Sequence, residues 1–189
     1  MTRTAFLDRD GTVNRDVDYC RSPEQLQLLP GAADAIRRLA AADFRCVIVT
    51  NQSGVARGYL TEHELARIHA TLHQQLDSLP LAYFHCPHHP EDAAGDPGYH
   101  RDCACRKPAP GLLHQACSLL APFGVSLQDG VVIGDSARDL LMGRGLPVKK
   151  VLVRSGKPVA EQRRLLKAAG CRPDHECRDL AAAVDWLLA

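Results

Sequence analysis

Two aspartates, Asp8 and Asp10, stand directly after the apolar run Ala5–Leu7 and just before Gly11. A carboxylate can attack a phosphate ester and form an aspartyl-phosphate, while a neighbouring carboxyl protonates the leaving oxygen and later deprotonates a water molecule. Gly11 allows the chain to turn tightly beside this pair. The same pattern is also common in polar turns, so it predicts catalysis only together with other motifs.

Three further polar motifs supply groups that phosphate chemistry needs. Thr50 follows the apolar run Cys46–Val49, and its hydroxyl with the next backbone N–H groups can hold a phosphoryl group. Arg106 and Lys107 can neutralise phosphate oxygens. Asp135 follows another apolar run and offers the oxygen ligands that Mg²⁺ prefers. Each motif alone also fits an inert loop, but the combination predicts a phosphoryl-transfer site.

Short apolar runs alternate with amphipathic segments along the chain. Predicted strands are Thr4–Leu7, Phe44–Val49, Leu81–His85, Val131–Ile133 and Lys150–Val153. Predicted helices are Ala32–Ala42, Glu62–Leu79, Leu112–Phe123, Val159–Ala169 and Asp179–Leu188. This alternation predicts one domain, residues 1–189, with a Rossmann-like α/β fold: a three-layer sandwich around a central parallel sheet. Such sheets bind ligands beyond the carboxyl ends of their strands, where the motifs above fall. Asp139 is expected to support this site or to play a structural part.

Composition narrows the classes of partner. The 189 residues are 46% hydrophobic and 24% charged, with a formal net charge of +1. No global basic field favours nucleic acid, and no run approaches the ~20 apolar residues of a membrane span. The amino terminus lacks the apolar core of a signal peptide. We therefore expect a cytoplasmic monomer with a small-molecule substrate, no nucleic acid and no membrane.

The segment from about residue 85 to 110 shows no periodicity and is rich in metal-ligating side chains. Cys86, His88, Cys103 and Cys105 offer three thiolates and one imidazole, a set typical of a closed, structural zinc site. His89 can replace His88 in this set. Scattered cysteines or a disulfide are the alternative interpretation, which a reducing cytosol disfavours. A zinc-bound loop insertion is thus predicted immediately before Arg106.

Taken together, these motifs resemble the haloacid dehalogenase superfamily of aspartate-nucleophile phosphatases, and within it the phosphatases that act on heptose bisphosphates. The likeness runs along nearly the whole chain. It implies that Asp8 is the nucleophile and Asp10 the acid and base. It implies Mg²⁺ held by the side chains of Asp8 and Asp135 and by the backbone carbonyl of Asp10. Thr50 and Lys107 would bind the transferred phosphoryl group.

The resemblance also implies a sugar bisphosphate substrate, which loses its C7 phosphate on the route to ADP- or GDP-heptose for lipopolysaccharide cores. The positions that would line its pocket are Asp16, Val17, Asp18, Tyr19, Asn51, Gln52, Ser53, Arg106 and Ser136. Two of them depart from the family pattern: Asp18 stands where glycine is frequent, and Ser136 where lysine is frequent. Both changes bear on contacts to the sugar.

Three alternatives remain beside this reading. A histidinol-phosphate phosphatase shares the superfamily core and a similar zinc loop. A non-catalytic zinc module would not need the complete set of catalytic side chains. A phosphotransferase normally needs a large cap that excludes water, and residues 11–30 leave room only for a minimal one.

Overall fold

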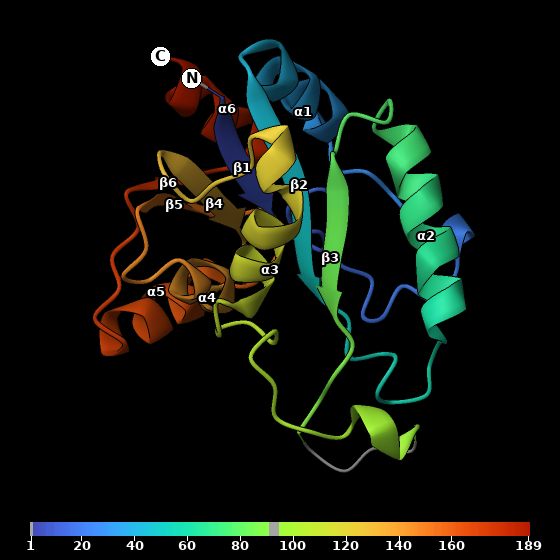
Figure 1. Ribbon diagram of the computed structural model, residues 1–189. Coiled ribbons are helices and arrows are strands. Elements are labelled where there is room, and N and C mark those ends of the chain that lie inside the picture. Colours follow the sequence, from blue (N-terminus) through green and yellow to red (C-terminus); the bar gives the residue numbers. More distant parts are fainter. Residues whose placement is uncertain (1, 91–94) are drawn as a thin grey trace.

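The central element is one parallel sheet of six strands in the order β3-β2-β1-β4-β5-β6 (Figure 1). The computed structural model describes residues 2–90 and 95–189. The strands are β1 (Arg3–Leu7), β2 (Phe44–Asn51), β3 (Ala82–Cys86), β4 (Gly130–Gly134), β5 (Val148–Val153) and β6 (His175–Cys177). All neighbouring strands pair in parallel, so their carboxyl ends share one edge of the sheet.

Helices cover both faces of this sheet. They are α1 (Ala32–Ala41), α2 (Glu62–Gln75), α3 (Gly111–Leu120), α4 (Ala137–Met142), α5 (Val159–Ala168) and α6 (Leu180–Leu188). Successive residues of β1 point to opposite faces: Ala5 and Leu7 pack with α1, α2 and α6, whereas Phe6 packs with α3. This period of two buries both faces of the strand. The predicted three-layer α/β sandwich is confirmed.

Several element boundaries differ from the sequence prediction. α2 ends at Gln75, before Leu79, because Asp77 and Ser78 adopt positive φ angles of 54° and 57°, which an α-helix does not contain. The α3 helix ends at Leu120 and continues as a 3₁₀ turn that contains Pro122, which has no N–H to donate. Strand β6 and helix α4, of three and six residues, were not predicted as elements.

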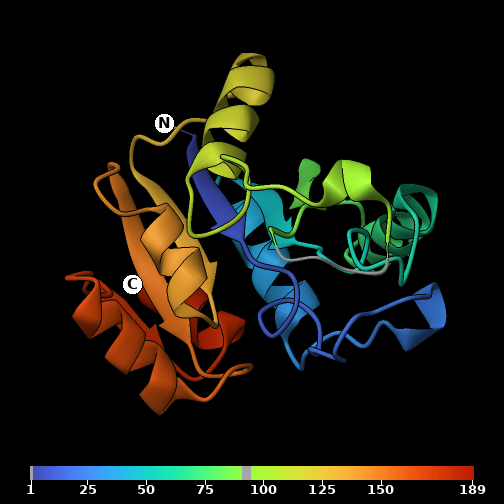
Figure 2. The same ribbon diagram turned by 90° about the horizontal axis from the view of Figure 1, so that it is seen from below.

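Two long connections extend from the carboxyl edge of the sheet. Residues 8–31, between β1 and α1, carry only a short 3₁₀ turn, Pro23–Gln25, as a helical element, which agrees with a minimal cap. The connection between β3 and α3 forms the loop below the sheet in Figure 1, and Figure 2 views the molecule from that side. Within this predicted zinc loop, residues 91–94 lie outside the described residues. In the part of the chain that the structure describes, no helix is long and apolar enough to cross a membrane.

Candidate active site and metal cluster

The predicted catalytic motifs meet in one cavity of about 270 Å³ at the carboxyl edge of the sheet. Asp8 follows β1, Thr50 lies near the end of β2, and Asp135 follows β4. The cavity is lined by Asp8, Arg9, Asp10, Asp16, Asp18, Tyr19, Cys20, Thr50, Asn51, Gln52, Ser53, His89, Arg106, Lys107, Asp135, Ser136, Arg138, Asp139 and Lys157. Parallel pairing brings these distant residues together, since every strand of the sheet ends at the same edge.

Lys107 forms the buried centre of the site. Its Nζ lies 2.6 Å from Asp8 Oδ1 and 2.5 Å from Asp139 Oδ1, and it donates to the backbone oxygen of Val49 at 3.0 Å. Burial lowers the pKa of this ammonium group, but the charges of Asp139 and Asp8 outweigh burial and raise it above its usual value. Lys107 therefore carries a fixed positive charge beside the predicted nucleophile.

Three buried carboxylates surround this single lysine. One oxygen from each of Asp8, Asp135 and Asp139 lies within 4.8 Å of the others. Burial and the charge of Asp139 raise the pKa of Asp8 well above its usual range, and the same two causes raise the pKa of Asp135 to about 7. Burial is the larger cause of both shifts, and the negative charge of Asp139 adds to it. A divalent cation with oxygen ligands fits this donor set.

The Asp135 carboxylate sits in a cradle of backbone. A Cβ atom at Gly11 or at Gly156 would collide with its Oδ2, and Lys157 donates its backbone N–H to the same oxygen at 2.8 Å. Gly11 also has a φ of +85°, which favours glycine. Two glycines thus let the segments after β1 and β5 close around the carboxylate.

Asp10 is oriented by three side chains. Arg9 donates from Nη2 to both carboxylate oxygens at 3.0 and 2.9 Å, Asn14 donates to Oδ1 at 2.9 Å, and Gln52 donates to Oδ2 at 2.8 Å. Burial raises the pKa of Asp10, but the Arg9 charge and these hydrogen bonds outweigh it and leave the pKa below its usual value. Metal binding through the Asp10 backbone carbonyl stays a prediction.

Two residues expected to contact substrate also hold predicted catalytic groups in place. The side chain of Asn51 donates to the Lys107 carbonyl at 3.1 Å and accepts from the Lys107 N–H at 3.0 Å. The amide of Gln52 donates to Thr50 Oγ1 at 2.9 Å as well as to Asp10. Both line the cavity, but their polar atoms orient Lys107, Thr50 and Asp10.

Three of the four residues in the first expected substrate loop line the cavity. Asp16 forms an ion pair with Lys157 at 2.5 Å. Asp18 and Tyr19 line the cavity with positive φ angles of 50° and 71°. Val17 instead packs against the main apolar core and is absent from the cavity lining. The strained backbone of Asp18 explains why glycine suits this position.

The remaining predicted residues divide between cavity and framework. Ser53 and Arg106 line the cavity. Ser136 is the N-cap of α4, and its Oγ donates to Asp139 Oδ2 at 2.6 Å. Asp139 therefore caps the helix with one oxygen and pairs with Lys107 through the other, which confirms its supporting position.

Sequence reasoning missed several residues of this site. Arg9 and Asn14 hold Asp10, and Arg138, Lys157 and His89 line the cavity. Arg9 had a visible signal, because an arginine between two aspartates is placed to pair with one of them. Lys157 also had one, since it follows β5, whose carboxyl end lies on the same edge as the other motifs.

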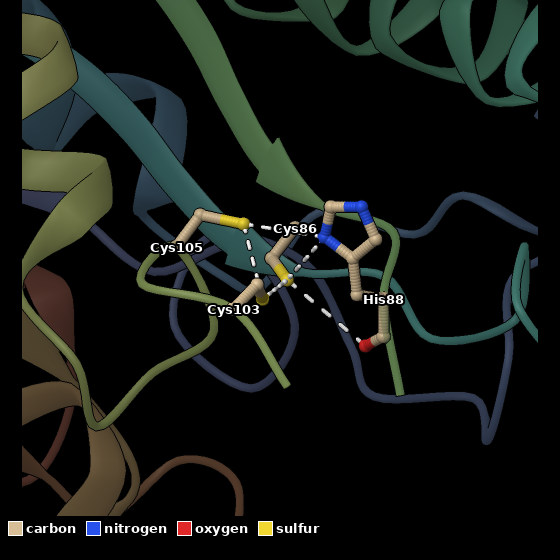
Figure 3. A group of neighbouring side chains, drawn as sticks. All are labelled: Cys86, His88, Cys103 and Cys105. Carbon is tan, nitrogen blue, oxygen red and sulfur yellow. Dashed lines mark hydrogen bonds between the residues drawn. The ribbon is translucent and has the colours of Figure 1, made fainter. Parts of the chain in front are cut away.

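The second predicted cluster lies in the loop after β3 (Figure 3). Cys105 Sγ lies 3.3 Å from Cys103 Sγ and 3.4 Å from His88 Nδ1, and Cys86 Sγ lies 3.5 Å from Cys103 Sγ. Ligands at zinc-bonding distances in a tetrahedron are about 3.3–3.8 Å apart. A disulfide needs about 2.0 Å between sulfurs, and all eight cysteines are free. The donor set and spacing fit a closed zinc site.

The side chains of the two adjacent histidines lie in different sites. His88 points its Nδ1 at the thiols, whereas His89 lines the catalytic cavity. Arg106 donates from Nη1 to the His88 carbonyl at 3.0 Å. Because Arg106 directly follows Cys105, the cluster and the predicted catalytic residue Lys107 share one short segment of chain.

Known proteins similar to this chain carry one recurring name. The chain is 38% identical over 165 residues to the D-glycero-beta-D-manno-heptose-1,7-bisphosphate 7-phosphatase of Pasteurella multocida, a match that covers 85% of this chain and 86% of the relative. It is 38% identical over 189 residues to the phosphatase of the same name from Bordetella bronchiseptica, covering 97% and 96%.

A family model and a solved structure agree with these relatives. The family model described as HAD-hydrolase-like matches residues 104–183. The crystal structure of D,D-heptose 1,7-bisphosphate phosphatase from B. bronchiseptica, complexed with magnesium and phosphate, superimposes with a TM-score of 0.79 at 36% identity. The match covers 99% of this chain and 98% of that protein.

Proposed function

Because this chain belongs to the D-glycero-D-manno-heptose-1,7-bisphosphate 7-phosphatase family of HAD-like hydrolases, we propose that it removes the C7 phosphate of the bisphosphate through an aspartyl-phosphate on Asp8. The observation that carries this proposal is the environment of the Asp8 carboxylate. It lies 2.6 Å from the Lys107 ammonium and beside two further buried carboxylates, two residues before the firmly held Asp10. This arrangement combines a nucleophile, a positive charge and a proton donor in one cavity.

In the first step, a carboxylate oxygen of Asp8 attacks the phosphorus and the bond from phosphorus to the C7 oxygen breaks. Asp10 gives its proton to that leaving oxygen. A phosphate dianion beside Asp10 favours the protonated form of this carboxyl, because like charges disfavour ionisation. Lys107 and Thr50 stabilise the transferring phosphoryl group.

In the second step, a water molecule attacks the phosphorus of the aspartyl-phosphate and the bond to Asp8 breaks. The Asp10 carboxylate now accepts the proton from that water. Asp8 is again a carboxylate and Asp10 carries the proton from that water; once inorganic phosphate has left, Asp10 loses this proton to solvent, and the next substrate phosphate favours its uptake again. Arg9, Asn14 and Gln52 keep the Asp10 carboxyl in one orientation through both proton transfers.

We propose that Mg²⁺ is held by the side chains of Asp8 and Asp135 and the backbone carbonyl of Asp10. The buried carboxylates and the glycine cradle around Asp135 support this assignment. When bound, the ion supplies positive charge that offsets the charge of the phosphoryl oxygens. Asp139 already pairs with Lys107 and caps α4, so we assign it to the framework.

We propose that Zn²⁺ at Cys86, His88, Cys103 and Cys105 is structural. Four protein donors leave no open position for a reacting water. The ion would fold the loop and fix Arg106, which binds the substrate. Free thiols fit a reducing compartment, and we place the enzyme in the cytoplasm, in the supply of activated heptose for lipopolysaccharide.

Phosphorus NMR tests the proposed function directly. Heptose 1,7-bisphosphate is incubated with the protein, with and without Mg²⁺, and both phosphate resonances are followed. We expect magnesium-dependent loss of the C7 resonance and retention of the C1 resonance. Hydrolysis of histidinol phosphate in preference to the heptose would discard the substrate and keep the Asp8 chemistry.

A further inference from the structure

A buried histidine on α2 lies behind the catalytic cavity. His69 is 8% exposed, and its ring stacks on Tyr83 with centroids 5.1 Å apart and an angle of 27°. Its Nε2 lies 3.2 Å from Nη1 of Arg9. The two residues are sixty positions apart, so the contact joins α2 to the segment that follows β1.

The direction of this hydrogen bond follows from the chemistry of the two groups. A guanidinium group can only donate, so Nε2 of His69 must be the acceptor and the ring proton must sit on Nδ1. A protonated imidazole would instead place two cations in contact. Burial, and after it the Arg9 charge, lower the pKa of His69 to about 3. The neighbouring His85 ring, 5.7 Å away, is paired with Glu62.

The opposite edge of the same guanidinium group holds Asp10. Arg9 donates from Nε to Asp10 Oδ1 at 3.2 Å, and from Nη2 to both carboxylate oxygens. Arg9 is 1% exposed, so water does not replace a lost partner easily. A buried donor without an acceptor is costly, and the guanidinium group would shift to find another. The imidazole thus fixes the plane of the group that orients the Asp10 carboxyl.

We propose that His69 is a positioning residue for the phosphatase reaction: as a neutral acceptor it fixes Arg9, and through Arg9 the carboxyl of Asp10. The proposal rests on the acid and base role of Asp10 in the proposed function. His69 does not line the cavity and touches no reacting atom. Its effect is therefore confined to the steps in which Asp10 moves a proton.

Two substitutions separate this role from simple packing. His69→Phe keeps the ring and the stack on Tyr83 but removes the acceptor, whereas His69→Gln removes the ring and keeps an acceptor at similar reach. If the acceptor matters, Gln retains activity and Phe loses it; a packing role predicts the reverse order. His73→Phe is the matched control, because His73 contacts the same Tyr83 ring, with centroids 5.8 Å apart, one turn later on α2.

The leaving group supplies the second readout. We measure kcat/KM, which reports the steps up to phosphoryl transfer, with heptose 1,7-bisphosphate and with p-nitrophenyl phosphate. The first leaving group needs a proton and the second hardly does. We expect His69→Phe to lower kcat/KM about tenfold on the bisphosphate and less than twofold on p-nitrophenyl phosphate, with His69→Gln and His73→Phe near wild type.

Three results would overturn the proposal: wild-type activity in His69→Phe, equal losses on both substrates, or a larger loss in His69→Gln than in His69→Phe. If neither variant folds, nitrogen NMR of the wild-type protein decides, since a protonated Nε2 on His69 at pH 7 contradicts an acceptor. Asp10→Asn separates the two levels of the argument. Wild-type turnover in that variant would refute the proposed function itself, whatever His69 does.

Discussion

Among the residues that the structure describes, two clusters of side chains that could hold a metal ion are built in opposite ways. The carboxylates of Asp8, Asp135 and Asp139 come from the ends of two strands and from α4, and the parallel sheet determines their positions. The thiols and imidazole of the second cluster come from the last residue of β3, Cys86, and from the loop that follows it. The first cluster opens into a cavity, whereas the second closes on itself.

This difference leads us to expect a catalytic role for the first cluster and a structural role for the second. The buried core around the acidic cluster holds its carboxylates in place, so we expect a cation there to serve the reaction. We expect the thiol cluster to need a metal to define the loop, because its free thiols form no covalent bond that would hold the two ends of the loop together. The two clusters are connected through the adjacent residues Arg106 and Lys107. Arg106 donates to the carbonyl of His88 in the thiol cluster, and Lys107 donates to Asp8 in the acidic cluster. Losses at the first cluster should affect turnover, and losses at the second should affect order first.

The largest effect is expected from Asp8→Asn. An amide is a poor nucleophile, so phosphate release should fall by at least about 10³-fold while the fold stays intact. Release of inorganic phosphate and far-ultraviolet circular dichroism measure the two properties. Asp129→Asn is the matched control, because this exposed residue precedes β4 at the opposite end of the sheet. Retained turnover in Asp8→Asn would break the assignment of chemistry to the acidic cluster.

The next largest effect is expected from Lys107→Met. Without the ammonium, phosphoryl stabilisation is lost and turnover should fall about 10²-fold. The buried carboxylates of Asp8 and Asp139 also lose their partner, and the free energy of unfolding without Mg²⁺ should fall by about 3 kcal/mol. Urea denaturation measures this change. The exposed pair of Lys157 and Asp16 gives the contrast, since Lys157→Met should alter stability far less. Equal decreases in the free energy of unfolding in Lys107→Met and Lys157→Met would contradict the central position of Lys107.

A smaller loss is expected when zinc is removed from the thiol cluster. Chelation, or Cys105→Ser, should lower turnover about tenfold in Mg²⁺-restored protein, because Arg106 and Lys107 lose their anchor. Hydrogen exchange should increase in the described loop residues 86–90 and 95–107 and remain slow in β1 and β4. Unchanged activity in the stripped protein would show that the two clusters are independent.

The smallest effect concerns pH and the buried His69. Its pKa is about 3 in the folded protein and near 6.5 when unfolded, so the unfolded chain binds the extra proton. Stability is therefore complete above pH 6.5 and decreases as the pH falls toward 3. Between pH 6 and 5, wild type should lose about 1 kcal/mol more than His69→Gln in urea denaturation. Equal losses would mean that His69 titrates normally.

The contrast between the two clusters also explains why the sequence could predict the residues of both. Asp8, Thr50 and Asp135 were found because each ends an apolar run, and parallel pairing then places them together without further information. The thiol cluster was found because its ligands lie close in sequence. Both signals are local in the sequence, and the fold then brings the residues of each cluster close together.

Contacts between side chains distant in sequence left no such signal. No sequence pattern around His69 predicts its hydrogen bond to Arg9. Likewise, no pattern around Asn51 predicts that its amide forms hydrogen bonds with the backbone of Lys107. Strand β6 was missed because its three residues, His175–Cys177, form no apolar run and gain their order from pairing with β5. Tertiary pairing, which local pattern does not encode, decides these features.

Detection of the phosphorylated enzyme tests the central claim most directly. Asp10→Asn is mixed with Mg²⁺ and p-nitrophenyl phosphate, whose leaving group hardly needs an acid, and the reaction is quenched with acid. Because the variant lacks the base for hydrolysis, one phosphoryl group should accumulate on the protein, and peptide mass spectrometry should place it on Asp8. Release of p-nitrophenol without any phosphoryl adduct, or an adduct on another residue, would contradict the account.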